Sequence, residues 1–233
     1  MFDVLSYDKL IAEGNYEPIF KSPELSYYFL KDKSLVKERK RAFKTLLKSS
    51  RFSLIYLKTT LDIPLEERKQ IILSISTNAR NSLYALKDFS FDIHDRELLL
   101  NSVLNDGYVC VLALRDIELS PEEKIKVYNK IKMSSDDSYS AITLLNLPPE
   151  VFDDFFNVAI TNTIRVYSIV NHIGGDLIKR LTSQQTTIIV DKILELNDFK
   201  ISKSMLNNKA FKLSKEDNDK LHALIIMHEL SKE

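Results

Sequence analysis

The chain repeats itself about every 28 residues, and this period restricts its fold more than any single residue does. An apolar residue recurs at Leu35, Ile63, Phe91, Leu119 and Leu147, and the series resumes with wider spacing at positions 181 and 213. Self-similarity on this scale is typical of stacked supersecondary units that bury only their neighbours' faces. The sequence therefore predicts an all-α fold, a right-handed α-solenoid of about seven to eight two-helix repeats.

The first half of each repeat has the pattern of an amphipathic helix, here called helix A. Counted from the repeat starts, the ninth and thirteenth positions are apolar throughout, and residues four apart lie on one helix face. The ninth positions are Phe43, Ile71, Leu99, Val127, Phe155, Ile189 and Leu221, and the thirteenth are Leu47, Ile75, Val103, Ile131, Ala159, Ile193 and Ile225. Proline and acidic residues at the expected starts, as in Pro121-Glu122-Glu123, favour a first helical turn.

The second half of each repeat predicts helix B. Residues 23–32, 79–88 and 107–116 occupy the same phase, and each segment ends with a leucine, a basic residue and an aspartate. The basic residue suits the negative end of a helix, and the aspartate can begin the following turn. Lys58 interrupts an otherwise apolar position of helix B, so we expect Leu57 to replace it in the core.

One continuous domain is predicted over residues 1–233, with repeats that start near 7, 35, 63, 91, 119, 147, 181 and 213. A joint near 172–180 explains the wider spacing, because Gly174-Gly175 can end a helix and Asp176 can begin a short extra one. A phosphate-binding loop is the alternative interpretation of these glycines. The segment lacks the spaced glycines and the lysine of a P-loop.

Composition favours a cytoplasmic location, the host cytoplasm if the protein is viral. Cys110 is the only cysteine, which excludes a disulfide framework and fits a reducing compartment, and its apolar slot predicts a small core residue. The start Met1-Phe2-Asp3-Val4 has no signal segment, and no apolar run is long enough to span a bilayer. We therefore expect no membrane association.

Catalytic and metal-binding motifs are missing from the sequence. The four histidines have no metal-ligand spacing, and no protease, hydrolase or kinase signature occurs. We predict that the protein is not an enzyme and binds no cofactor, metal or small-molecule substrate. An enzyme whose site is assembled from distant repeats is the third hypothesis.

Basic residues are concentrated between Lys31 and Lys58, although the net charge of the chain is zero. Lys37, Arg41, Lys44 and Lys48 follow helical spacing and predict one basic stripe, with Arg51 beyond it. The stripe could meet phosphates or an acidic protein surface, or it could be a solvated helix face.

Tyrosines recur at the twenty-first or twenty-second position of the repeat. They are Tyr27, Tyr28, Tyr56, Tyr84, Tyr139 and Tyr167. Such a ladder could line a groove, where tyrosine offers a large contact area with a polar tip. Alternatively, the rings fill the space between repeats and direct their hydroxyl groups to the edge.

Two segments carry a resemblance to other proteins. Residues 22–32, which begin Ser22-Pro23-Glu24 and end Leu30-Lys31-Asp32, and residues 79–88 resemble the "SPE-x-AYYFAKD" type of short two-helix repeat in uncharacterised bacterial and bacteriophage proteins. A more distant similarity is to HEAT-type repeats. The resemblance covers the first four repeats and fades after Pro149. It implies a helical-repeat fold and a bacterial or phage origin, and it assigns no role to any residue.

A solenoid offers extended surface and few deep pockets, which suits a protein partner better than a small substrate. We therefore predict a non-enzymatic protein-binding module, in a narrower form a phage-encoded inhibitor of a host or defence protein. The alternative is a nucleic-acid-binding α-solenoid that uses the basic N-terminal surface, and strong salt dependence of its affinity would distinguish it. The candidate partner-binding residues are Lys37, Arg41, Lys44, Lys48, Arg51, Tyr28, Tyr56 and Tyr84.

Overall fold

The computed structural model describes residues 4–32, 38–172 and 176–231. These residues form sixteen α-helices and one short 3-10 helix without any strand, and 75% of them are helical. The predicted all-α helical-repeat fold is confirmed. The chain divides into two compact units, Met1–Ser120 and Pro121–Glu233. The handedness of a superhelix and a single continuous domain stay predictions.

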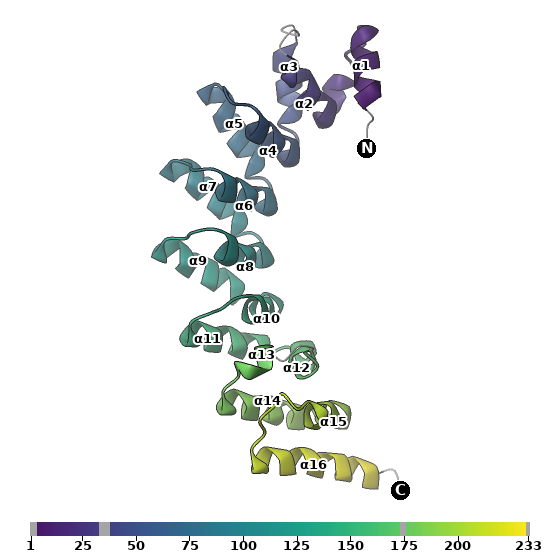
Figure 1. Ribbon diagram of the computed structural model, residues 1–233, viewed down its shortest axis with the longest axis vertical. Helices are drawn as coiled ribbons and strands as arrows, with labels where there is room; N and C mark the ends of the chain where they lie inside the picture. Colours follow the sequence, from purple (N-terminus) through teal and green to yellow (C-terminus); the bar gives the residue numbers. More distant parts are fainter. Residues whose placement is uncertain (1–3, 33–37, 173–175, 232–233) are drawn as a thin grey trace. The chain divides into compact units, whose positions relative to one another are not determined.

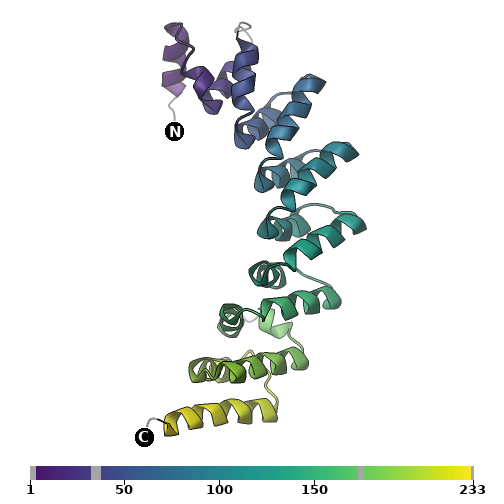
Figure 2. The same cartoon turned by 180° about the vertical axis from the view of Figure 1, so that it is seen from behind.

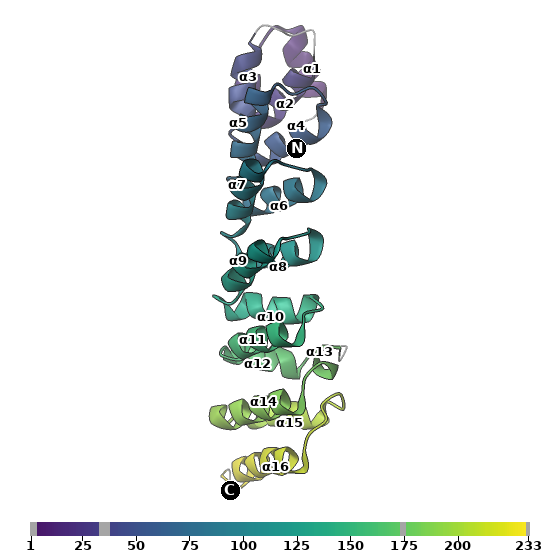
Figure 3. The same ribbon diagram turned by 90° about the vertical axis from the view of Figure 1, so that its left-hand side faces the viewer.

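Unit 1 is built from two layers of helices (Figures 1 and 3). It begins with α1 (Val4–Ala12) and the 3-10 helix η1 (Ile19–Lys21). Helices α3 (Arg39–Leu46), α5 (Leu65–Ile75) and α7 (Ile93–Val103) form the helix A layer. The helix B layer consists of α2 (Pro23–Lys31), α4 (Ser50–Thr59), α6 (Ala79–Asp88) and α8 (Gly107–Asp116). The helix B bounds expected at 79–88 and 107–116 are confirmed.

Unit 2 repeats this arrangement (Figures 1 and 2). Its helices A are α9 (Pro121–Ile131), α11 (Pro149–Ala159), α14 (Ser183–Leu196) and α16 (Lys215–Leu230). Its helices B are α10 (Ser135–Leu144), α12 (Thr163–Val170) and α15 (Phe199–Asn207). The short helix expected after the glycines is present as α13 (Asp176–Lys179). Gly174 and Gly175 themselves lie outside the described residues.

Helix B begins at a polar cap. A small residue one turn after the cap contacts the end of the preceding helix A. The caps, whose side chains accept a hydrogen bond from a backbone amide two or three residues later, are Ser22, Ser49, Asn78, Asp106, Ser134, Asn162 and Asp198. Four residues after its cap, buried Ser82 donates to the Ile75 carbonyl at 3.3 Å. Buried Cys110 donates to Val103 in the same way, so the predicted core role of this cysteine is confirmed.

The predicted core columns are buried in both units, with one exception in the second repeat. Leu47 is half-exposed, and the fully buried Leu46 takes the place that Ile75 holds in the third repeat. Leu57 is likewise buried in place of exposed Lys58, as expected. The helices of this repeat are therefore displaced by one residue, which turns their faces by about 100° relative to the sequence alignment.

The loop after α4 restores the register. It comprises residues 60–64, whereas the loops after α6 and α8 comprise only residues 89–92 and 117–120. Its Leu61 is almost fully exposed. A single extra residue in a surface loop thus corrects the phase of the following repeats without disturbing their cores.

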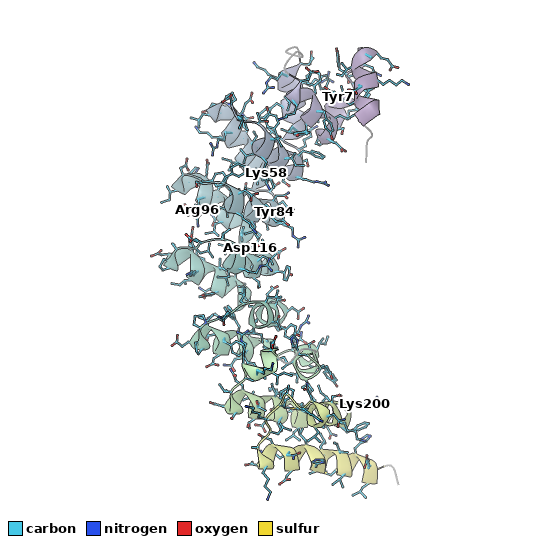
Figure 4. All side chains as sticks on the ribbon, in the orientation of Figure 1. Tyr7, Lys58, Tyr84, Arg96, Asp116 and Lys200 are labelled. Atoms are coloured by element: carbon cyan, nitrogen blue, oxygen red, sulfur yellow. The ribbon has the colours of Figure 1, made fainter. Side chains whose placement is uncertain are left out.

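Charged side chains at the ends of helix B connect successive repeats in unit 1. Lys58 forms an ion pair with Asp88, and the Lys87 Nζ lies 3.8 Å from an Asp116 carboxylate oxygen. Arg115 Nε also donates to Asp116 at 2.8 Å. Lys58 and Asp116 lie along one edge of the helix B layer (Figure 4). In α6, Asp88 therefore pairs with the preceding repeat and Lys87 with the following one.

Asp116→Asn should make unit 1 less sensitive to acid. The hydrogen bond from Arg115, together with Lys87, holds the pKa of Asp116 below its usual value. A depressed folded-state pKa stabilises the protein above the unfolded value of about 3.9, and this contribution disappears as the pH falls through the folded value. The melting temperature of the parent should exceed that of the variant at pH 7, and the difference should shrink below pH 4. An equal difference in melting temperature at pH 7 and below pH 4 would contradict this prediction.

Candidate protein-binding surface

The predicted basic stripe is only partly available to a partner. Lys37 lies outside the described residues. Arg41, Lys44, Lys48 and Arg51 are exposed, but Arg41 donates two hydrogen bonds to the Glu17 carboxylate, at 2.8 and 2.9 Å. This pairing raises the pKa of Arg41 and lowers the pKa of Glu17. The charge of Arg41 is therefore already balanced, whereas Lys44 and Lys48 form no ion pair with any described residue.

The predicted tyrosine anchors do not join the basic stripe. Tyr28 packs against Tyr7 of α1, with ring centres 6.0 Å apart. Tyr84 is 44% exposed on α6, where the Lys58 Nζ lies 5.9 Å from the centre of its ring (Figure 4). Both tyrosines belong to the helix B layer, whereas Arg41 and Lys44 belong to the helix A layer.

The assignment of Tyr56 to a contact surface is wrong for the structure as it stands. Its side chain is only 1% exposed, because the one-residue displacement of the second repeat turns it into the core. It corresponds structurally to the buried Ala85 and not to the exposed Tyr84. A partner cannot reach the ring in this conformation.

A groove of about 950 Å³ lies between α3 and α5 of unit 1. We call it the α3/α5 groove. It is lined by Glu38, Arg39, Lys40, Arg41, Phe43, Lys44, Leu47, Glu66, Glu67 and Gln70. The α3 side is rich in basic residues and the α5 side carries two carboxylates, and half-exposed Leu47 adds apolar surface. Two residues of the predicted stripe, Arg41 and Lys44, line this groove.

Arg39 connects three helices beside the groove, and the sequence analysis missed it. It donates to the Leu30 carbonyl at 3.2 Å, to the Tyr56 hydroxyl at 2.9 Å and to the Glu67 carboxylate at 3.4 Å. Burial alone would lower the pKa of Arg39, but its bonds to Tyr56 and Glu67 raise it. One signal was available: α3 begins with Arg39 and Lys40, where the macrodipole favours acidic residues.

The backbone at the start of α3 adopts an unusual conformation. Glu38, which lines the groove, has a φ of 66°, in the left-handed region that residues with a Cβ seldom adopt. Its carbonyl accepts the first hydrogen bonds of α3, from Arg41 and Ala42. Backbone strain of this kind is concentrated at functional sites.

Charge changes sign across the outward side of the helix A layer, which we call the helix A face. It consists of the exposed and half-exposed side chains of α3, α5 and α7, together with Lys48 just after α3. The charged residues of the α3 region are Arg39, Lys40, Arg41, Lys44 and Lys48 against Glu38, those of α5 are Glu66 and Glu67 against Arg68 and Lys69, and those of α7 and its cap are Asp92, Asp95 and Glu97 against Arg96. The face therefore has an excess of positive charge at α3, balanced charge at α5 and an excess of negative charge at α7.

A second groove, of about 590 Å³, lies between α5 and α7 on this face. Leu65 and Leu73 of α5 and Leu98 of α7 line it, together with charged residues of both helices. Leu65 is 66% and Leu73 60% exposed. Two large apolar side chains on one helix, beside a groove, are a typical feature of a protein-binding surface.

Other kinds of site find no support within the described residues. They contain no cluster of three histidine, cysteine or acidic side chains that could hold a metal ion. None of the described helices is both long and apolar enough to cross a membrane. Comparison of the chain with protein-family models, curated proteins and solved structures finds no match. The resemblance of residues 22–32 and 79–88 to phage and bacterial repeats therefore stays a prediction.

Proposed function

We propose that the chain is a non-enzymatic protein-binding module and that its partner binds the helix A face of unit 1. The α3/α5 groove supports this proposal most directly, because its lining combines basic, acidic and apolar side chains. Lys40 and Lys44 have no ion pair with a described residue, whereas Glu66 and Glu67 in the same groove are paired with Lys69 and Arg39. A protein surface can supply charges of both signs together with an apolar side chain for Leu47.

Nucleic-acid binding is the second candidate, favoured by the exposed row Lys44, Lys48 and Arg51. One feature weighs against it: Arg41, which lines the α3/α5 groove, is already neutralised by Glu17. The narrower proposal, a phage-encoded inhibitor of a host or defence protein, rests on the resemblance of the repeats alone.

Photo-crosslinking from the groove tests the proposal. Lys44→p-benzoylphenylalanine places a reactive group on the exposed side of α3, and Lys126→p-benzoylphenylalanine places the same group on exposed Lys126 of α9. In a lysate of the source organism, we expect nuclease-resistant crosslinks to protein from position 44 and none from position 126. Crosslinks that vanish with nuclease would support the nucleic-acid alternative, and equal crosslinking from both positions would contradict a defined surface.

Charge reversal provides the quantitative test once a partner is captured. Lys40→Glu/Lys44→Glu should weaken binding by more than about tenfold, because two attractive contacts become repulsive. The helical circular dichroism signal should remain, since exposed charges contribute little to folding. The matched control Lys124→Glu/Lys126→Glu reverses two exposed lysines of α9 and should leave the affinity unchanged.

A further inference from the structure

The charge order on the helix A face makes this face complementary to itself. The basic end at α3 and the acidic end at α7 lie on opposite sides of α5, in the same layer of unit 1 (Figure 3). Rotating a second copy by half a turn about an axis that lies in the plane of contact and runs parallel to α5 would place each α3 opposite the other copy's α7. Such an isologous contact satisfies both charge pairs at once and closes without further growth.

We propose that the helix A face of unit 1 binds the same face of a second copy, so that the protein forms an isologous dimer centred on α5. This inference rests on the proposed function, because it names the occupant of the same protein-binding face. Self-association and binding of a foreign partner to this face are then mutually exclusive.

The unpaired charges support a second copy as the occupant. Lys40 and Lys44 of α3, and Asp95 and Glu97 of α7, form no ion pair with any described residue. In the dimer the two lysines face the two acids of the other copy. An unrelated partner would need both an acidic and a basic patch in matching positions, whereas a second copy supplies both by symmetry.

Apolar side chains lie where the two-fold axis would pass. Leu65 and Leu73 of α5 are more than half exposed, and both line the groove toward α7. Contact between the two α5 helices would remove them from water, at about 25 cal/mol for each Å² of apolar surface buried. Beside them, Glu66 and Lys69 form an ion pair within each α5, at 3.1 Å, so that the centre of the contact carries balanced charge.

Sedimentation velocity of the full-length chain tests the dimer. The parent protein should show a concentration-dependent monomer–dimer equilibrium that shifts toward monomer in high salt. Lys40→Glu/Lys44→Glu should raise the dissociation constant by more than about tenfold, and Asp95→Lys/Glu97→Lys should do the same. A 1:1 mixture of these two variants should form a heterodimer, because each basic end again meets an acidic end.

Two further variants identify the surface. Leu73→Asp should abolish the dimer, because it places a charge in the centre of the contact. Ile164→Asp replaces a comparably exposed apolar residue of α12 and should leave the dimer intact. Circular dichroism confirms that each variant keeps its helical signal.

The outcomes separate the dimer from the proposed function. A parent protein that stays monomeric at 100 µM, or charge variants whose mixture fails to form a heterodimer, would overturn the dimer. If position 44 nevertheless crosslinks another protein, the proposed function stands. If it crosslinks neither a second copy nor any other protein, both proposals fail.

Discussion

Ile71→Asp should lower the free energy of unfolding by more than about 4 kcal/mol, because it places an unpaired carboxylate in the core of unit 1. Ile71 is completely buried in α5. For a chain of this length, the loss corresponds to a fall in melting temperature of roughly 8 °C or more. Thermal unfolding followed by circular dichroism measures the effect. Ile131→Asp, at a fully buried position of α9, makes the same test in unit 2.

Two control variants separate the effect of burial from the effect of the new side chain. Gln70→Asp introduces the same side chain at the adjacent, exposed position of α5, and Lys130→Ala removes a charge beside Ile131. Both should change stability by no more than about 0.5 kcal/mol. Because repeats contact mainly their neighbours, hydrogen exchange should localise the loss in Ile71→Asp to unit 1. Equal melting temperatures for Ile71→Asp and Gln70→Asp would refute the core assignment.

The fold could be predicted because each repeat applies the same local rules. Apolar residues four apart determine the buried face, as at Ile71 and Ile75, and polar caps such as Asn78 determine where helix B begins. These signals act over a few residues and recur in every repeat. A helix position that is ambiguous in one repeat can therefore be assigned from the same position in its neighbours. The relation between the two units has no such local signal, and the sequence alone could not provide it.

The register of the second repeat shows where a periodic alignment fails. A fixed period places Leu47 in the core and Tyr56 among the surface tyrosines. The structure instead buries Leu46 and turns Tyr56 inward. Lys58 in an apolar column was the visible sign of this displacement. The same shift applies to every residue of that repeat, and therefore also to its tyrosine.

The candidate site was predicted only in part, because charge balance depends on contacts between distant residues. Arg41 and Lys44 look equivalent in the sequence, yet Arg41 is paired with Glu17, which lies 24 residues away. The carboxylates of Glu66 and Glu67 enter the groove from a different repeat. The stripe is basic along α3 in the sequence. In the structure it forms one wall of a groove whose other wall carries negative charge.

Arg39→Ala should lower the free energy of unfolding by about 2–3 kcal/mol, the second largest effect expected. The change removes three hydrogen bonds and leaves the Tyr56 hydroxyl, on a side chain that is 1% exposed, without its donor. Arg39→Lys should recover only part of the loss, because a single ammonium group cannot match the planar fork that reaches these acceptors. Chemical denaturation monitored by circular dichroism measures both variants.

A double-mutant cycle with Tyr56→Phe assigns the cause. In the parent, Tyr56→Phe should cost about 1 kcal/mol, since it removes one partner of the bond that Arg39 donates. In the Arg39→Ala background the same change should be close to neutral, because the hydroxyl it removes has already lost its donor. The cycle should therefore give a coupling energy of about 1 kcal/mol between the two side chains. Additive losses would mean that Arg39 acts through Leu30 and Glu67 alone, and that the Tyr56 hydroxyl finds another partner when α3 shifts.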